Sequence, residues 1–408
     1  MGKYYEAGRE LPVSESTEVL IVGGGIAGVA AAMAAARGGA KVTLIEREYG
    51  LGGLATLGLI AIYLPLDDGL GNQVIHGIAE ELFRLSIRHG CDGKAPTAWL
   101  ENGSPEEKKK GRFVAQFNPM LFALEMERTL RDLGVHILYG TVAVSVMKDG
   151  DRIAAVVVEN KSGRSVIECA SCIDCSGDAD VAYLAGAETV LHEGGNGIAS
   201  WYYYKEKGDV KLKMFGLADL PPKKPGEEGE DPYDNVKVAS LTTTRFSGVD
   251  GPELSDAVQQ AHEKMYEDIM SHREQDAEYA PVTISSIPLV RMSRRIAGEY
   301  TLDESEVRKP FDDSIGLTGD WRRVGPCFEI PYRTLYSAKV PNLICAGRNI
   351  SVTDSMWDIT RVIPPCAVTG EAAGTAAAMT SDFASLDVDV LQKKLASQNV
   401  QLHISEEK

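Results

Sequence analysis

The hydrophobic positions near the start of the chain follow the order of a strand, a turn, a helix and a second strand. Residues 18–22 form a short, mostly apolar run, three glycines follow, and an alanine-rich segment continues to about Arg37. A second run extends from Lys41 to Ile45 and is followed by Glu46. Short apolar runs between turn residues are typical of strands buried on both faces. The pattern therefore predicts one strand–turn–helix–strand unit and an α/β fold.

Later parts of the chain carry the patterns of other elements. Residues 136–175 alternate between apolar and polar positions, with turn residues at 149–150 and 162–163, and predict hairpin strands. The other predicted elements are an amphipathic helix at 118–133 with Leu121, Leu124, Met126 and Leu130 near one face, an exposed helix at 255–274, a buried strand at 342–346 and a helix of small residues from Pro364 to about Met379. Two segments rich in charge, glycine and proline, 101–112 and 221–234, predict surface loops.

Three glycines between the first strand and the first helix form the pattern Gly-x-Gly-x-x-Gly. Gly23 permits a tight turn, Gly25 lacks the Cβ atom that would keep a pyrophosphate away, and Gly28 lets the helix lie close to the strand. The N–H groups at the helix start, from Ile26 and Ala27, and the positive end of the helix dipole then favour phosphate. Because the pattern lies between a strand and a helix, it predicts a dinucleotide site.

The acidic residue after the second strand distinguishes among dinucleotides. Glu46 lies about 20 residues after the glycine pattern, where a carboxylate accepts hydrogen bonds from ribose hydroxyls. A carboxylate there repels a 2′-phosphate, which disfavours NADP. A second glycine loop follows and resembles the segment that passes under the ribityl chain in FAD enzymes. The predicted cofactor-binding residues of this segment are Arg47, Gly52, Gly53, Ala55 and Thr56.

Two distant strand ends complete the cofactor pattern. One strand ends in Ser176 and Gly177, and another ends in Gly347 and Arg348. In flavoproteins with two dinucleotide-binding domains, strands with such ends return to the cofactor in this order. A plain NAD dehydrogenase has no counterpart to the last strand end, so the pattern favours FAD.

These motifs together resemble one known family. The chain is similar to the bacterial FAD-dependent oxidoreductases of the glutathione-reductase type, which have two dinucleotide-binding domains and are related to fumarate reductase flavoproteins and glucose-inhibited division proteins. The segments that carry the resemblance are 22–28, 52–56, 174–181, 291–300, 328–333, 342–351 and 361–374. The resemblance implies FAD as the cofactor. It also implies a Rossmann-like FAD-binding domain, with a parallel sheet and a small antiparallel β-meander, into which an α+β substrate domain is inserted.

The resemblance further implies where several residues lie. Val142 is expected beside the adenine through its backbone, and Arg348 beside the pyrophosphate or the ribityl chain. The helix start at Val362 and Ile363 is expected near the pyrimidine edge of the flavin, where a helix N-terminus would stabilise the anionic reduced flavin. In the same helix, the glycine spacing at 370–374 predicts close packing.

The resemblance implies a discontinuous arrangement of domains. The insertions between the cofactor-binding segments are expected to cover the flavin ring. The expected parts are an FAD-binding domain of residues 16–60, 119–190 and 340–382, a substrate or cap region of residues 61–118 and 191–339, and a C-terminal tail of residues 383–408.

Candidate catalytic residues lie in or beside the expected substrate region. The predicted catalytic residues are Arg361, Arg294 and Tyr332. The other members of the same cationic group are Arg291, Arg295 and Arg333. These arginines could bind a substrate carboxylate through bidentate bonds, or they could pair with acids that hold the domains together. Candidates for a proton relay are His76 and His192, for which a structural or exposed position is the simpler interpretation. Candidates for proton transfer or stacking, for which core packing is the simpler interpretation, are Tyr63, Tyr332, Trp201 and Trp357.

The charge balance narrows the possible partners. The 408 residues include 42 Lys and Arg and 59 Asp and Glu, which gives a formal net charge of −17. Binding to nucleic acids needs a basic face, and docking on anionic membranes needs basic clusters, so neither is expected. We expect a small-molecule substrate. The electron donor or acceptor and the oligomeric state, a homo-oligomer included, stay open.

Cysteine content and the first residues bear on location. The seven cysteines, an odd number, fit reduced thiols in the cytoplasm. Residues 1–6 contain no apolar signal core, and no apolar stretch is long enough to cross a bilayer, so we expect a cytoplasmic protein. Cys169, Cys172 and Cys175 fall on a predicted strand, where odd spacings alternate between faces. We therefore expect buried thiols and no metal site.

Three functions are compatible with these features. The leading interpretation is an enzyme, an FAD-dependent oxidoreductase that transfers hydride between a small polar organic substrate and flavin N5. A second is a biosynthetic enzyme similar to thiazole synthases, which use the same fold to bind an adenine dinucleotide. A third is a flavoprotein that takes part in RNA modification, which the acidic composition disfavours.

Overall fold

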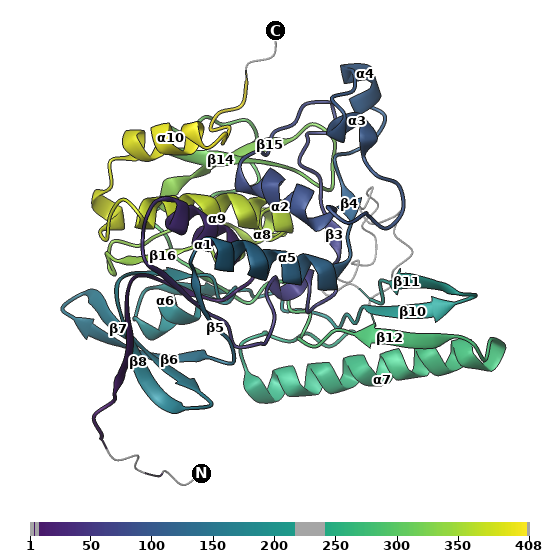
Figure 1. The fold of residues 1–408 in the computed structure, drawn as a ribbon, viewed down its shortest axis with the longest axis horizontal. Coiled ribbons are helices and arrows are strands. Elements are labelled where there is room, and N and C mark those ends of the chain that lie inside the picture. The colour runs from purple at the N-terminus through teal and green to yellow at the C-terminus, as the bar shows by residue number, and fades with distance from the viewer. Residues whose placement is uncertain (1–3, 5–7, 217–240, 406–408) are drawn as a thin grey trace.

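The computed structural model describes residues 4, 8–216 and 241–405. The loop predicted at 221–234 and most of residues 1–6 lie outside the described residues. The main sheet has seven strands in the order β5-β2-β1-β8-β7-β6, and β16 pairs with β8 beside this path (Figure 1). Its strands are β1 (Val13–Val22), β2 (Val42–Ile45), β5 (His136–Leu138), β6 (Val142–Asp149), β7 (Arg152–Asn160), β8 (Gly163–Asp174) and β16 (Leu343–Cys345).

The parallel half of this sheet brings five strand ends into one row. Pairing aligns Val22 of β1 with Ile45 of β2 and with Asp174 of β8. Ile45 is in turn aligned with Leu138 of β5, and Asp174 with Cys345 of β16. The other half is antiparallel, because β7 joins β6 to β8 through two hairpins. The predicted α/β fold class, with a parallel sheet and a small antiparallel meander, is therefore confirmed.

Alternate residues of β1 serve two different cores. Val19 and Ile21 belong to the core that includes helices α1 (Ile26–Arg37) and α9 (Ile363–Ala377). Leu20 and Val22 belong to a second cluster that includes Val181 of helix α6 (Asp180–Leu184). Both faces are thus apolar and covered, as expected of a central strand in a parallel sheet. In open α/β sheets of this kind, ligands bind outside the carboxyl ends of the strands.

The helices α1 (Ile26–Arg37) and α9 (Ile363–Ala377) pack side by side on one face of the sheet (Figure 1). A Cβ atom on Gly370 would lie 2.3 Å from the carbonyl oxygen of Ala27, and one on Gly374 would lie 2.2 Å from that of Ala31. The two backbones therefore approach so closely that only glycine fits at these positions. The packing predicted from the glycine spacing at 370–374 is confirmed.

Helix α5 (Pro119–Asp132) forms where the sequence predicts it, but with a different buried face. The side chain of Asn118 caps its N-terminus. Phe122, Met126 and Leu130 are buried at intervals of four residues, whereas Leu121 and Leu124 are 42% and 64% exposed. The predicted face was therefore wrong at these two leucines, because the buried stripe follows Phe122 instead.

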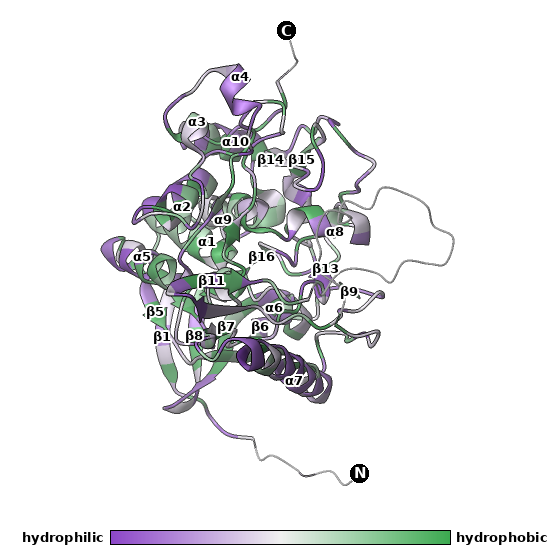
Figure 2. Cartoon of the chain, turned by 90° about the vertical axis from the view of Figure 1, so that its right-hand side faces the viewer, coloured by the Kyte–Doolittle hydropathy of each residue, from purple (hydrophilic) through white to green (hydrophobic). Residues whose placement is uncertain are grey.

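The parts of the chain between the predicted cofactor-binding segments form smaller sheets and helices. Helix α7 (Gly251–Gln275) buries only one narrow stripe and is largely hydrophilic in Figure 2. It packs on a three-stranded sheet of β10, β11 and β12 (Figure 1). The remaining strands are β3 (Ile62–Tyr63), β4 (Ala115–Gln116), β9 (Thr189–Leu191), β10 (Tyr202–Glu206), β11 (Asp209–Lys213), β12 (Ala280–Ile284), β13 (Arg294–Ile296), β14 (Ser314–Gly319) and β15 (Cys327–Pro331).

The segment at 101–112 is not wholly a loop. It contains the short helix α4 (Pro105–Lys108), which Ser104 and Glu107 stabilise through a reciprocal capping box. The other helices are α2 (Ile78–Ser86), α3 (Thr97–Leu100), α6 (Asp180–Leu184), α8 (Asp354–Thr360), α10 (Val388–Ser397) and the 3₁₀ turns Gly53–Ala55, Tyr332–Thr334 and Phe383–Ser385. Within the described ranges, none of the helices combines the length and hydropathy that a bilayer-spanning segment needs.

The predicted placement of the three clustered cysteines is confirmed. Cys169 and Cys172 lie on β8, Cys175 directly follows it, and all three are buried. Burial raises the pKa of each thiol. The predicted domain boundaries stay a prediction, and Tyr63 and Phe83 of the expected cap region share a hydrophobic core with α1 and α9.

Candidate functional site

The three glycines of the turn after β1 have different surroundings. A Cβ atom on Gly23, where φ is +104°, would lie 2.4 Å from the carbonyl oxygen of Cys175, and one on Gly28 would lie 1.9 Å from that of Gly23. A Cβ atom on Gly25 would have no protein atom within 4 Å. Gly25 is also the N-cap residue of α1, and in the described part of the chain no side chain caps this helix end. The turn therefore leaves an open cradle above Gly25.

The second glycine loop lies directly against this turn. Gly52 pairs with Gly25 in a parallel bridge, and the N–H group of Gly52 donates to the carbonyl of Gly24 at 2.8 Å. The backbone is left-handed at Gly52 and at Gly53, with φ of 102° and 53°. Next to them, Ala55 is buried, and the Thr56 hydroxyl donates to the carbonyl of Leu51 at 2.5 Å. The structure thus brings the predicted second loop to the cradle.

Glu46 lies at the end of β2, next to the glycine turn. Its carboxylate accepts the N–H groups of Gly24 at 2.6 Å and Glu48 at 2.9 Å. Burial raises the pKa of Glu46, while these two hydrogen bonds lower it in part. The carbonyl of Glu46 accepts the N–H group of Thr141, which places Val142 close by at the start of β6. The side chain of Arg47 is exposed.

The ends of β8 and β16 meet at the same edge. Arg348 donates from Nε to the carbonyl of Gly177 at 2.7 Å, from one terminal nitrogen to Asp178 at 2.6 Å, and from the other to the carbonyl of Val290 at 2.6 Å. A Cβ atom on Gly347, where φ is +93°, would lie 2.8 Å from Cβ of Ala27. Arg348 therefore links the two strand ends beside the start of α1.

Asp174 lies at the same strand edge, and the sequence analysis did not single it out. It is fully buried at the end of β8. One carboxylate oxygen accepts from the N–H and hydroxyl groups of Ser176 and from the amide of Asn349, and the other accepts from the N–H group of Ala182. These bonds fix the turn at Ser176. The signal was an acidic residue two positions before the Ser-Gly pair at the strand end.

Helix α9 begins at the junction with α8. Val362 is its N-cap, and Ile363, Pro364 and Pro365 form its first turn. Proline lacks an N–H group and has the φ angle of a helix start, so it suits this position. The side chain of Arg361, which precedes the junction, forms an ion pair with Asp358.

The residues around the cradle fit a dinucleotide. The uncapped first turn of α1 at Gly25, Ile26 and Ala27 offers N–H groups and a positive dipole end to a pyrophosphate. Glu46 offers a carboxylate for a ribose. Both groups lie at the carboxyl edge of the parallel strands, where ligands bind in open α/β sheets.

The three predicted catalytic residues have different neighbours. Arg294 pairs with Asp180 at 2.6 Å and lies 4.2 Å from the ring centre of Tyr183, and Arg361 pairs with Asp358. Burial raises the pKa of Asp180 to about 6. Tyr332 is fully buried, and its hydroxyl donates to the carbonyl of Phe383 at 3.1 Å. Burial also raises its pKa. Each of these three groups thus has a partner of its own, and their catalytic role stays a prediction.

The remaining arginines of the predicted cationic group have acidic or aromatic neighbours. Arg333 forms an ion pair with Asp313 at 2.9 Å, and Arg295 lies 3.4 Å from Asp354. The guanidinium of Arg295 also lies 5.2 Å from the ring centre of Trp357, while His192 contacts Asp354 at 3.0 Å. Arg291 lies 5.8 Å from the ring centre of Trp201. The structure thus shows acid pairing for Arg294, Arg295, Arg333 and Arg361.

The open glycine turn, the acidic strand end and the parallel sheet define a dinucleotide-binding protein. A family model described as "FAD dependent oxidoreductase" matches residues 18–200 and 199–395. The chain belongs to this family, and its cofactor is FAD.

Similar proteins cover this chain to very different extents. The carotenoid phi-ring synthase of Streptomyces griseus is 55% identical over 47 residues, which are 12% of this chain and 9% of that protein. THI4 of Thermovibrio ammonificans is 18% identical over 44% of this chain and 66% of that chain, with a TM-score of 0.31. A geranylgeranyl bacteriochlorophyll reductase-like protein from Thermoplasma acidophilum is 13% identical over 95% of this chain and 93% of that chain, with a TM-score of 0.46.

Proposed function

We propose that this protein is an FAD-dependent oxidoreductase that transfers hydride between a small polar organic substrate and the flavin. The observation that carries the proposal is the open cradle above Gly25, at the sheet edge where Glu46 and the second glycine loop converge. The family match supports flavin as the redox group at this place. Bound FAD supplies a hydride acceptor or donor at N5.

The residues of the chain would bind and orient the cofactor. The first turn of α1 would hold the pyrophosphate, and Glu46 the ribose of the adenosine half. The first turn of α9, at Val362 and Ile363, would place the positive end of a helix dipole near the flavin and favour its reduced, anionic form. The partly buried ion pair of Arg348 with Asp178 would fix the two strand ends around the cofactor.

Arg295 is our candidate for contact with an anionic group of the substrate. It is 8% exposed, and its Nε has no hydrogen-bond partner among the residues that the structure describes. Burial lowers its pKa, and the distance of 3.4 Å to Asp354 leaves this ion pair loose. A substrate carboxylate would satisfy the buried guanidinium through bidentate bonds. A small carboxylated hydroxy compound or amine has this chemistry.

The absorbance spectrum of the purified protein, before and after acid precipitation, tests the proposal. A flavin spectrum that is released into the supernatant supports it, and anaerobic bleaching by hydroxy acids, sugars or amines would then identify the substrate class. A colourless protein that FAD does not reconstitute would contradict the proposal. Such a protein, with a bound adenine dinucleotide, would favour the biosynthetic alternative that resembles thiazole synthases.

A further inference from the structure

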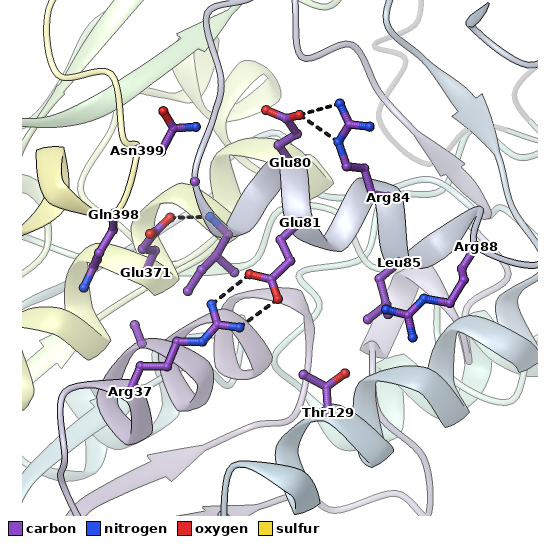
Figure 3. Close-up of a pocket in the computed structure, with 13 residues that line it drawn as sticks. Arg37, Glu80, Glu81, Arg84, Leu85, Arg88, Thr129, Glu371, Gln398 and Asn399 are labelled. Atoms are coloured by element: carbon purple, nitrogen blue, oxygen red, sulfur yellow. Dashed lines mark hydrogen bonds and ion pairs between the residues drawn. The ribbon is translucent and has the colours of Figure 1, made fainter. Parts of the chain in front are cut away.

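A separate pocket lies beside the middle of α9, away from the first turn of that helix. It has a volume of about 500 Å³ and is bounded by α1, α2, α5, α9 and the residues that follow α10 (Figure 3). Glu371 of α9 lies on its wall, about two helical turns, or about 12 Å, along the axis from Ile363. The pocket is therefore distinct from the cradle at Gly25.

The Glu371 carboxyl is buried, and only one of its two oxygens has a hydrogen-bond partner among the residues that the structure describes. The residue is 1% exposed, and its Oε2 accepts the N–H group of Ile78 at 2.8 Å, at the N-terminus of α2 (Figure 3). Its Oε1 is buried and has no hydrogen-bond partner among the residues that the structure describes. A buried carboxylate oxygen without a donor is costly, so such groups mark places where a further donor is needed.

The other charged side chains of the pocket already have partners. Arg37 binds Glu81 through two bonds of 2.7 and 2.8 Å, as Figure 3 shows. Arg84 binds Glu80 at 2.8 Å. Arg88 pairs at 2.8 Å with Glu125 of α5. Because these pairs neutralise one another, Glu371 is left as the acid of the pocket that lacks a cation within the described part of the chain.

We propose that this pocket binds a small organic cation, a primary ammonium compound, whose N–H group donates to Oε1 of Glu371. The amide side chains of Gln398 and Asn399 and the hydroxyl of Thr129 line the same space and can serve the polar remainder of the ligand. An ammonium group supplies both the missing donor and the missing charge, whereas a neutral donor supplies only the first. The proposal does not depend on the redox function.

Binding of a cation is coupled to a proton. Burial raises the pKa of Glu371 to about 8, so the carboxyl is protonated near neutral pH. An ammonium group beside it favours the carboxylate, and the complex therefore releases a proton. The charged groups that line the pocket around it are Arg37, Glu80, Glu81, Arg84 and Arg88. Four of these groups pair with one another within the pocket, and Arg88 pairs with Glu125 of α5. A proton on Glu371 competes with the bound cation, so the affinity for the cation falls as the pH falls below 8.

Isothermal titration of the FAD-loaded protein with 1,4-diaminobutane at pH 7 tests the proposal. We expect saturable binding whose heat changes with the ionisation enthalpy of the buffer, because a proton is released. 1,4-Butanediol, which lacks the charge, should not bind. Succinate tests the opposite case, an anion held by the arginines. Binding of succinate without binding of the diamine would overturn the proposal, as would the absence of binding by all three compounds.

Two variants locate the site. Glu371→Gln keeps an acceptor for Ile78 but removes the charge, and it should weaken diamine binding at least about tenfold and abolish proton release. Thr129→Phe leaves Glu371 intact and fills the pocket, so it should weaken binding similarly even if the first variant folds poorly. Glu106→Gln, at an exposed site on α4, should bind like the unchanged protein. Equal binding by all three variants would overturn the assignment to this pocket.

Discussion

Glycines have two different roles in the region where α1 and α9 meet, one at the start of α1 and another along α9. At the start of α1, Gly25 faces open space, and a side chain there would touch no protein atom. Further along, Gly370 and Gly374 face the backbone of α1 so closely that even a methyl group would collide with it. The open glycine is thus available to a ligand, whereas the other two belong to the fold. Substitutions should therefore separate cofactor binding from stability.

A substitution in the closely packed part of the α1–α9 contact should have the largest effect on stability. In an isolated helix, Gly374→Ala would be favourable by about 1 kcal/mol. Here the added Cβ would lie 2.2 Å from the carbonyl oxygen of Ala31, so we expect the free energy of unfolding to fall by about 3 kcal/mol. Urea unfolding measures this change. Gly251→Ala, where a Cβ would meet nothing within 4 Å, is the matched control. Equal stability of the two variants would show that the helices do not pack this closely.

A substitution at the open glycine, Gly25, should weaken cofactor binding without changing stability. Gly25→Val places a branched side chain where the pyrophosphate would lie, and we expect FAD affinity to fall at least about a hundredfold, or about 2.7 kcal/mol. The backbone at Gly25 is extended, with φ of −67°, so valine fits there without strain. The thermal midpoint without FAD should therefore change little. Gly111→Val, another open glycine, is the control for flavin retention. Full flavin retention by Gly25→Val would contradict the site.

A substitution of Glu46, at the edge of the cradle, tests whether its carboxylate contributes to cofactor binding. Glu46→Gln preserves an acceptor for the N–H group of Gly24 but removes the charge that a ribose hydroxyl would meet. We expect FAD to bind about tenfold more weakly, measured by fluorescence quenching of the titrated flavin. Glu48→Gln, two residues away, should leave the affinity unchanged. If both variants bind FAD alike, Glu46 has only a structural role.

Taken per pH unit, the smallest effect is the change in stability that the titration of Glu371, on the pocket side of α9, produces. The pKa of Glu371 is raised to about 8 in the folded protein, whereas an unfolded glutamate has a pKa of about 4.3. Between these values the folded state binds more protons, so its stability is greatest at low pH and declines as the pH rises towards 8. The decline should be about 1 kcal/mol per pH unit.

Urea unfolding at several pH values between 5 and 8.5 measures this slope. Glu371→Gln should remove it, and Glu106→Gln should retain it. The same slope in all three proteins would mean that the carboxyl of Glu371 titrates normally.

Elements with strong local signals could be predicted from the sequence. The first strand, helix and second strand, the β6–β8 hairpins, and α7 and α9 all form close to the expected residues. The close packing at 370–374 also followed, because two glycines four residues apart leave a groove on one helix face. The cofactor segments could be placed because each carries glycines at a strand end.

What could not be predicted depends on partners that are distant in the sequence. Which acid pairs with Arg294 or Arg348 is decided by the way β13, β16 and α6 meet, and no local pattern encodes this. The same holds for Glu371, whose partner Ile78 lies at the start of another helix. On α5, the choice of Phe122 over Leu124 depends on where α1 and α2 lie. Local periodicity shows that a helix has an apolar face, but its neighbours decide which residues are covered.

The pairing of α1 with α9 also constrains how the protein is made. Every residue from Ile26 to Ala35 is buried, yet the helix that covers them lies more than 300 residues later in the chain. At about 5–20 residues per second, a ribosome takes roughly 20 to 70 s to synthesise the intervening segment. During that time α1 presents its apolar surface without its final neighbour. We therefore expect that other segments of the chain or a chaperone cover this surface until α9 is made, and that a protein truncated before α9 is degraded.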